Sequence, residues 1–219
     1  MVAWIGDGQC ATPSQCRSGE VSVNGQCSPI ALVKAKKGSY PTALPCPTGY
    51  QLAGSWLTGL GKNDGLYRGV GYDSQGVDSG IMWLCSADIT KVKTVIAWND
   101  CGGPRDMCEG QMQTRGVWHV GDGCGLIDTG TNFSGTPIKA GWLGLCVSSA
   151  VGAKVEVAYN DCQGCGSQTG CGGWRGEGAW KPDPGSCGCE NGKPKAPTGS
   201  GAGGGVISSG WMGICVDTR

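Results

Sequence analysis

The 219-residue sequence has little histidine, little phenylalanine and no excess of charge: one His, one Phe, and 17 basic against 17 acidic residues. The single His119 argues against a zinc site, whose ligands come as clusters of cysteine and histidine. The lysine group at residues 34–37 is too small to indicate nucleic acid as a partner. No apolar run is long enough to span a membrane as a helix. We therefore expect no nucleic-acid partner, no membrane span, no metal and no cofactor.

Two residue types are present in excess, with 43 glycines and 15 cysteines. The glycine share is near a fifth of the chain against a usual value of roughly 7%. Reduced cytosolic proteins rarely accumulate cysteine at this density. We therefore predict disulfides and a secreted, extracellular or cell-surface location. Because the count is odd, at least one thiol is left over. Strand-like residues follow Met1 directly, so we interpret the chain as a mature form.

Self-similarity organises most of the chain. Equal intervals separate Trp56, Trp118 and Trp180, and each follows a glycine two positions earlier. Three related apolar segments also end in cysteine, at Cys85, Cys146 and Cys215. These series predict three copies of one folding unit. The boundaries are 46–107, 108–170 and 171–219, preceded by a strand at 1–9 and a cysteine-containing arm at 10–45.

The segments are typical of short strands, because glycine, asparagine and proline interrupt nearly every interval and no helical period is sustained. The glycine-rich stretch 198–205 is predicted to be a loop. The third copy ends before its closing strand, and Val2–Ile5 resembles the Val-Ile-Ala-Trp of the first copy. We therefore predict an all-β, disulfide-rich array of three repeats, closed by the N-terminal strand pairing into the third.

The first copy carries Cys46-Pro-Thr-Gly-Tyr50, then Gly80-Ile-Met-Trp-Leu-Cys85, then Trp98-Asn-Asp-Cys101. This order resembles one repeat of the vitelline membrane outer layer proteins. The resemblance implies a pseudo-threefold β-prism of three sheets, closed by its N-terminal strand. It also implies a secreted coat protein linked to N-acetylglucosamine oligosaccharides. The family's acidic stretch before the cysteine strand is not matched here, and fold alone does not fix function.

The resemblance further implies that the cysteine leading each copy bridges to the cysteine ending its second strand. The implied pairs are Cys46–Cys85, Cys108–Cys146 and Cys171–Cys215. The other nine cysteines stay unassigned.

The sequence gives little support for a catalytic site. A serine–histidine or cysteine–histidine pair would have to use His119, which we interpret as a solvent-facing strand residue. Asp100 and Asp161 occupy matching places in two copies, but Asn-Asp before a cysteine is typical of a turn. We therefore predict a non-catalytic protein.

The aromatic residues are better candidates for binding, because sugars stack on exposed rings. The repeated Trp56, Trp118 and Trp180 are interpreted as core. Tyr67, Tyr72 and Trp174 lie in loop-like segments and are predicted to contact a ligand. Asp122 and Asp128, in a glycine-rich loop of the second copy, are weaker candidates.

The predicted function is a structural or carbohydrate-binding protein of an extracellular coat or matrix. Its partners would be a carbohydrate or glycoconjugate and other coat or surface proteins. A receptor-binding adhesin tip of a pilus, phage or bacterial surface is the alternative. An enzyme acting on N-acetylglucosamine oligosaccharides is a weaker one. Asn132-Phe133-Ser134 is a glycosylation sequon.

Overall fold

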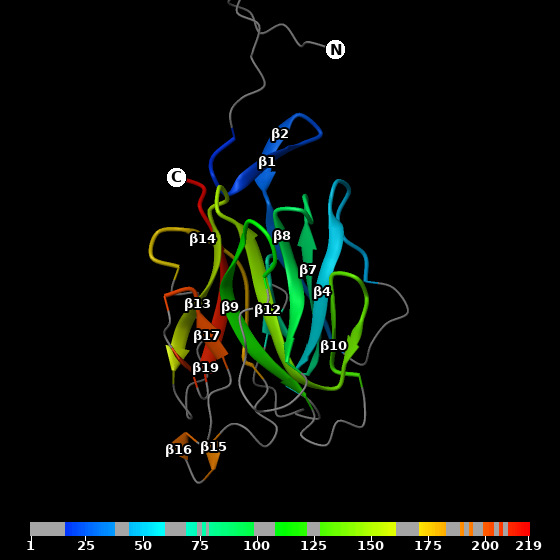
Figure 1. The fold of residues 1–219 in the computed structure, drawn as a ribbon, viewed down its shortest axis with the longest axis vertical. Helices are drawn as coiled ribbons and strands as arrows, with labels where there is room; N and C mark the ends of the chain where they lie inside the picture. Colours follow the sequence, from blue (N-terminus) through cyan, green and yellow to red (C-terminus); the bar gives the residue numbers. More distant parts are fainter. Residues whose placement is uncertain are drawn as a thin grey trace, which may run out of the picture.

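A computed structural model describes residues 16–37, 44–59, 69–73, 76–77, 79–98, 108–121, 128–160, 171–182, 189–190, 193–194, 199–203, 206–207 and 210–219. Within these ranges all regular structure is β-strand, arranged as three five-stranded sheets and two short hairpins (Figure 1). All of the strand pairs in these sheets are antiparallel. The prediction of an all-β chain is confirmed.

The three sheets share one plan, with a short hairpin at one edge, two long central strands, and a long strand at the other edge. In spatial order the first sheet contains β11 (Pro137–Ile138), β10 (Gly130–Asn132), β4 (Gln51–Thr58), β7 (Gly80–Ser86) and β3 (Ala31–Lys37). The second contains β18 (Val206–Ile207), β17 (Gly199–Gly201), β9 (Met112–Gly121), β12 (Ala140–Ser148) and β8 (Val92–Trp98). The third contains β6 (Gly76–Val77), β5 (Gly69–Gly71), β14 (Arg175–Trp180), β19 (Gly210–Val216) and β13 (Ala153–Asn160).

Two further hairpins stand outside these sheets. The first joins β1 (Glu20–Val23) to β2 (Gln26–Pro29), and the second joins β15 (Cys189–Glu190) to β16 (Lys193–Pro194). The turn between β1 and β2 is Asn24-Gly25, with φ of 51° and 81°. An Asn-Gly pair with positive φ suits the twist of a two-residue hairpin. The β1–β2 hairpin lies at the same end of the molecule as the C-terminus (Figure 1).

Each large sheet takes its strands from three separate parts of the sequence. In the second sheet, β9 and β12 belong to the segment 108–170, β8 to the segment before it, and β17–β18 to the segment after it. The hairpins β10–β11 and β5–β6 are likewise placed in sheets whose central strands lie elsewhere in the sequence. The sheets are therefore interlocked through their edges.

The edge strand of the first sheet differs from the sequence-based expectation. Val2–Ile5, predicted to pair into the third copy, lies outside the described residues. The cysteine strand of the third sheet, β19, is already flanked by β13 and β14. The edge position that β8 and β13 hold in their sheets is held in the first sheet by β3, within the segment 10–45 that we predicted to be an arm. The strand was missed because Ala31–Lys37 lacks the Asn-Asp-Cys ending, although pairing requires only backbone groups and one apolar face.

A second expectation fails in the glycine-rich stretch 198–205. Gly199–Gly201 form β17, which pairs with β9 through Gly199 opposite Trp118 and Gly201 opposite Gly116. Glycine content predicted a loop here because it weakens strand propensity, but the neighbouring strand supplies the hydrogen bonds.

The core lies between the three sheets and centres on the repeated tryptophans. Trp56, Trp118 and Trp180 are at most 1% exposed. Their ring centroids are 4.8 to 5.0 Å apart, with interplanar angles of 55° to 64°. Edge-to-face contacts of this kind add ~0.5–1.5 kcal/mol per pair beyond burial of apolar area. The three long central strands that carry these rings therefore meet at one mutual contact.

A glycine precedes each of these tryptophans by two residues and has an unusual backbone. Gly54, Gly116 and Gly178 have φ of 140°, 136° and 132°. Strand register shifts beside all three, as expected for β-bulges. A Cβ on Gly54 would collide with Thr94, and one on Gly116 with Val155. The repeated glycines thus allow strands of adjoining sheets to approach closely.

Four disulfides lie within the described residues, and three of them have corresponding places. Cys46–Cys85, Cys108–Cys146 and Cys171–Cys215 each join the segment before a central strand to the neighbouring central strand, and they are the pairs that the resemblance implies. The fourth joins Cys16 to Cys27. Closing loops of 38 to 44 residues contributes about 4 kcal/mol each in the chain-entropy model. Such disulfides indicate folding in an oxidising, extracellular environment.

Candidate functional site

The sheets meet at three corners, each made by one backbone hydrogen bond. At each corner an amide that follows the inner strand of an edge hairpin donates to a carbonyl of a long edge strand. Tyr72 donates to Val33 at 2.7 Å, Phe133 to Thr94 at 3.2 Å, and Ala202 to Val155 at 2.8 Å. We name the corners after these donors. The backbone is the same at all three, whereas the side chains differ.

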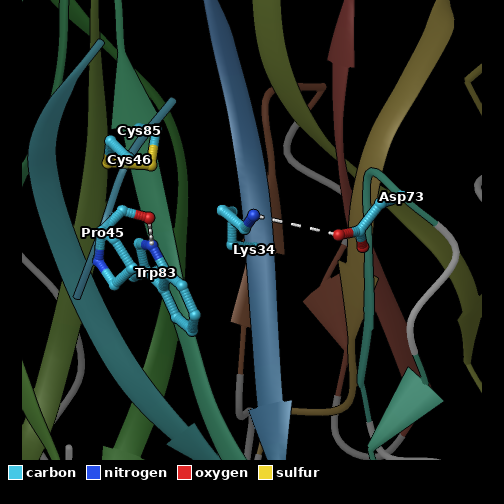
Figure 2. Close-up of a disulfide and its surroundings, with 6 residues drawn as sticks. All are labelled: Lys34, Pro45, Cys46, Asp73, Trp83 and Cys85. Carbon is cyan, nitrogen blue, oxygen red and sulfur yellow. Dashed lines mark hydrogen bonds and ion pairs between the residues drawn. A yellow bond between two sulfur atoms is a disulfide. The ribbon is translucent and has the colours of Figure 1, made fainter. Parts of the chain in front are cut away.

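The Tyr72 corner carries a half-buried ring beside an ion pair. The Lys34 ammonium lies 5.6 Å from the centroid of the Tyr72 ring and 4.0 Å from Oδ2 of Asp73. Figure 2 shows Lys34 on β3 reaching across to Asp73, on the side away from the Cys46–Cys85 disulfide. The side chains of Lys34 and Asp73 are 25% and 34% exposed. An aromatic ring, a cation and a carboxylate are therefore all accessible within one small area.

Tyr50 borders the same corner. Tyr50 and Tyr72 both pack against one apolar cluster on the outer face of the first sheet, which includes Leu32 and Trp83. The Tyr50 hydroxyl donates to the Pro29 carbonyl at 2.6 Å. Burial, followed by the nearby negative charge of Glu177, raises the pKa of Tyr50 above its usual value. Tyr50 is thus a neutral, fixed side chain beside Tyr72.

The segment that carries Tyr50 is itself anchored. Trp83 donates from Nε1 to the Pro45 carbonyl at 3.3 Å, next to the Cys46–Cys85 disulfide (Figure 2). The indole of Trp83 is only 3% exposed. The segment 44–50 is therefore held to β7 by a covalent bond and a hydrogen bond.

A buried carboxylate lies behind this corner. Glu177 on β14 is 1% exposed, and Oε1 pairs with Nε of Arg175 at 2.6 Å. Burial raises the pKa of Glu177 to about 7, although the positive charge of Arg175 lowers it. Sequence reasoning missed this residue. Its buried position could have been inferred from the repeat, because Glu177 directly precedes Gly178 and the corresponding residue of the first copy is the apolar Ala53.

Among the described side chains, neither of the other two corners shows this combination. At the Phe133 corner, the Lys93 ammonium lies 4.3 Å over the Phe133 ring, so a cation of the chain itself covers one face. The adjoining turn is closed by the Asn132 side chain. At the Ala202 corner the donor residue is alanine and contributes no ring. The Tyr72 corner is thus distinguished by an aromatic hydroxyl beside groups of both charges.

Trp174, a predicted ligand residue, has its own partners. The Lys154 ammonium lies 4.4 Å from the centroid of its ring, and the Arg219 guanidinium carbon lies 5.9 Å from it. Strand register puts Trp174 before β14 where Tyr50 stands before β4, since Arg175 and Gln51 face Val216 and Ser86. Tyr50 and Trp174 thus hold corresponding places in the first and third sheets. Lys154 covers part of the Trp174 ring that a sugar would use.

Some of the remaining predicted site residues lie outside the described ranges and others lie within them. Tyr67 and Asp122 lie outside the described residues, as do Asp100 and Asp161. Asp128 is exposed and directly precedes buried Thr129. The structure therefore brings the predicted Tyr72 together with Lys34, Asp73 and Tyr50, and gives Trp174 separate contacts.

His119 corrects one expectation, because it is buried and not solvent-facing. It is 0% exposed, and its ring contacts Trp142 edge to face at a centroid distance of 5.5 Å. Strand alternation correctly places His119 on the face opposite Trp118. That outer face is covered, however, and the sequence does not reveal what covers an outward residue. Within the described ranges, no group of three or more histidine, cysteine or acidic residues is placed to hold a metal ion.

No protein-family model, no curated protein and no solved structure matches the chain. In the part of the chain that the structure describes, there is no helix long and apolar enough to cross a membrane.

Proposed function

We propose that this chain is a secreted, non-catalytic carbohydrate-binding protein of an extracellular coat or matrix. Its three sheets would form a pseudo-threefold β-prism like that of the vitelline membrane outer layer proteins. The three corresponding disulfides and the shared plan of the sheets support this relationship.

The observation that carries the binding proposal is the Tyr72 corner. Saccharide sites combine a ring face for stacking with polar groups that orient the hydroxyls. Tyr72 supplies the ring, Lys34 supplies a donor, and Asp73 supplies an acceptor. The nearby Tyr50 is held by its hydrogen bond to Pro29, which limits the entropy that binding would cost. We assign the sugar to this corner because, among the described side chains, it alone combines a tyrosine hydroxyl with an ion pair of a lysine and a carboxylate.

The test is a glycan array followed by titration calorimetry with chitooligosaccharides and with the array's best ligands. Tyr72→Ala is expected to weaken binding tenfold or more, about 1.4 kcal/mol. Phe133→Ala is the matched control, because it removes a half-buried ring at the corresponding backbone position and should leave affinity unchanged. Equal affinity of the wild type and the Tyr72→Ala variant would overturn the assignment of the corner.

The array also separates the alternative functions. Binding to many N-acetylglucosamine oligosaccharides is the expected result for a coat protein. Binding to one surface glycan alone would favour an adhesin tip. Release of shortened oligosaccharides by the wild type would overturn the non-catalytic assignment.

A further inference from the structure

The turn at residues 132–136 begins with an asparagine that has no counterpart in the other two hairpins. In the hairpins at the other two corners, Gly71 and Gly201 occupy the register position that Asn132 has here, opposite Gly178, Gly116 and Gly54 respectively. Asn132-Phe133-Ser134 is also the only Asn-x-Ser/Thr sequence in the 219 residues. The one sequon of the chain therefore lies in the β10–β11 hairpin.

The Asn132 side chain is held by one of its two polar atoms. Oδ1 accepts hydrogen bonds from the Ser134 amide at 3.1 Å, the Ser134 hydroxyl at 2.9 Å and the Thr136 amide at 2.9 Å. Within the described residues, every hydrogen bond of this side chain uses Oδ1, and Nδ2 is not among the buried unpaired atoms. A group attached to Nδ2 would leave all three hydrogen bonds intact.

The surroundings have room for a large substituent. Ser134, Gly135, Thr136 and Pro137 are all exposed, and a Cβ on Gly135 would meet no atom within 4 Å. The chain also carries disulfides formed in an oxidising environment, the compartment in which sequons are modified.

The geometry points to Asn132 as an N-glycosylation site, used when the chain passes through a secretory pathway that contains an oligosaccharyltransferase. The donor is an oligosaccharide linked to a lipid diphosphate. The bond between the anomeric carbon and the diphosphate oxygen breaks, and a bond from that carbon to Nδ2 forms. The amide loses one proton, and the lipid diphosphate leaves.

Such a glycan would affect the three corners differently. It would project beside the Phe133 corner and shield it, while the Tyr72 corner belongs to a different pair of sheets. The modification does not depend on the proposed sugar binding, and a failure of either leaves the other standing.

The experiment is secretion of the full chain from cultured eukaryotic cells, followed by mass spectrometry before and after peptide-N-glycosidase. We expect the wild type to carry one removable glycan, located at Asn132 by conversion of that residue to aspartate. Ser134→Ala should secrete without it, because Asn132 keeps both backbone hydrogen bonds but the sequon is lost. Asn132→Gln is a second variant and should also lack the glycan.

Gln26→Ser is a matched positive control. It creates a sequon at Asn24, in the exposed turn between β1 and β2. Modification of Asn24 in this variant shows that the transferase reaches hairpin turns of this chain. An unmodified Asn132 in the secreted, disulfide-bonded protein would overturn the proposal, as would an unchanged glycan in the Ser134→Ala variant.

Discussion

The Tyr72 and Phe133 corners have the same backbone contact and different side chains. At the first, a tyrosine ring lies beside Lys34 and Asp73, and both charges are partly exposed. At the second, Lys93 covers the phenylalanine ring at 4.3 Å and Asn132 closes the turn. A repeated hydrogen bond therefore fixes where each hairpin lies, and substitutions around it decide what each corner offers to a ligand. The interior shows the opposite pattern, with one buried tryptophan at the corresponding strand position of each sheet.

The largest expected effect concerns the shared interior. Trp56→Ala, Trp118→Ala and Trp180→Ala should each lower the free energy of unfolding by about 3–5 kcal/mol, because each leaves a large cavity beside two other indoles. Guanidinium denaturation with the disulfides intact measures this. The three values should agree within about 1 kcal/mol. A variant that loses far less than the others would mean that the copies do not share one frame.

The close approach at the bulges gives the next largest effect. Gly54→Ala and Gly116→Ala should each cost roughly 3 kcal/mol, since the new methyl group meets Thr94 or Val155 and the φ is unfavourable for alanine. Gly203→Ala is the control, because nothing lies within 4 Å of its added Cβ. Equal stability of all three variants in the same denaturation assay would contradict the bulge geometry.

The buried carboxylate behind the Tyr72 corner predicts a pH dependence. Since the pKa of Glu177 rises from 4.5 to about 7, the folded state binds the proton more tightly than the unfolded state. The contribution of Glu177 to stability is therefore highest below about pH 4.5 and falls as the pH rises toward 7, by an amount on the order of 3 kcal/mol.

Glu177→Gln should flatten this profile and gain stability relative to the wild type at pH 8. Glu109→Gln, at an exposed position, should keep the wild-type profile. Thermal unfolding measured from pH 4 to pH 8 compares the three proteins. A profile that stays steep in the Glu177→Gln variant would assign the dependence to another group.

The smallest expected effect on stability is at Lys34, which we propose binds the sugar and contributes little to folding. Lys34→Gln should change the free energy of unfolding by less than about 0.5 kcal/mol, because its ion pair with Asp73 is long and partly exposed. It should nevertheless weaken sugar binding several-fold. Lys91→Gln, which removes an ion pair with Asp88 at 3.2 Å, is the control and should affect neither stability nor binding. Unchanged affinity in the Lys34→Gln variant would show that Lys34 does not bind the sugar.

The features that repeat along the chain could be predicted from the sequence. The tryptophans, the glycines before them and the leading and terminal cysteines all recur at matching intervals, because each must satisfy the same buried contact in every copy. Sequence reasoning did not find β3, since an edge strand needs backbone groups and alternating apolar residues and no particular motif.

The candidate site was harder to predict because it depends on segments far apart in the sequence. Tyr72 was identified as an aromatic residue of a loop-like segment, and Asp73 follows it directly, but Lys34 lies on β3 of another sheet and only the fold brings it to this corner. Glu177 and His119 show the same limit. Burial of an outward or bulge residue depends on what lies across from it, which local sequence does not encode.

The exchange of edge strands among the sheets has a consequence for how this architecture can change. A gene segment for one copy does not encode a separable module, because its hairpin and its closing strand complete two other sheets. Deleting a copy would open gaps in all three sheets, whereas a single backbone cut in a connecting loop would leave both fragments hydrogen-bonded to the rest. Loops can therefore diversify, and even be nicked, while the exchange of strands among the three sheets is retained.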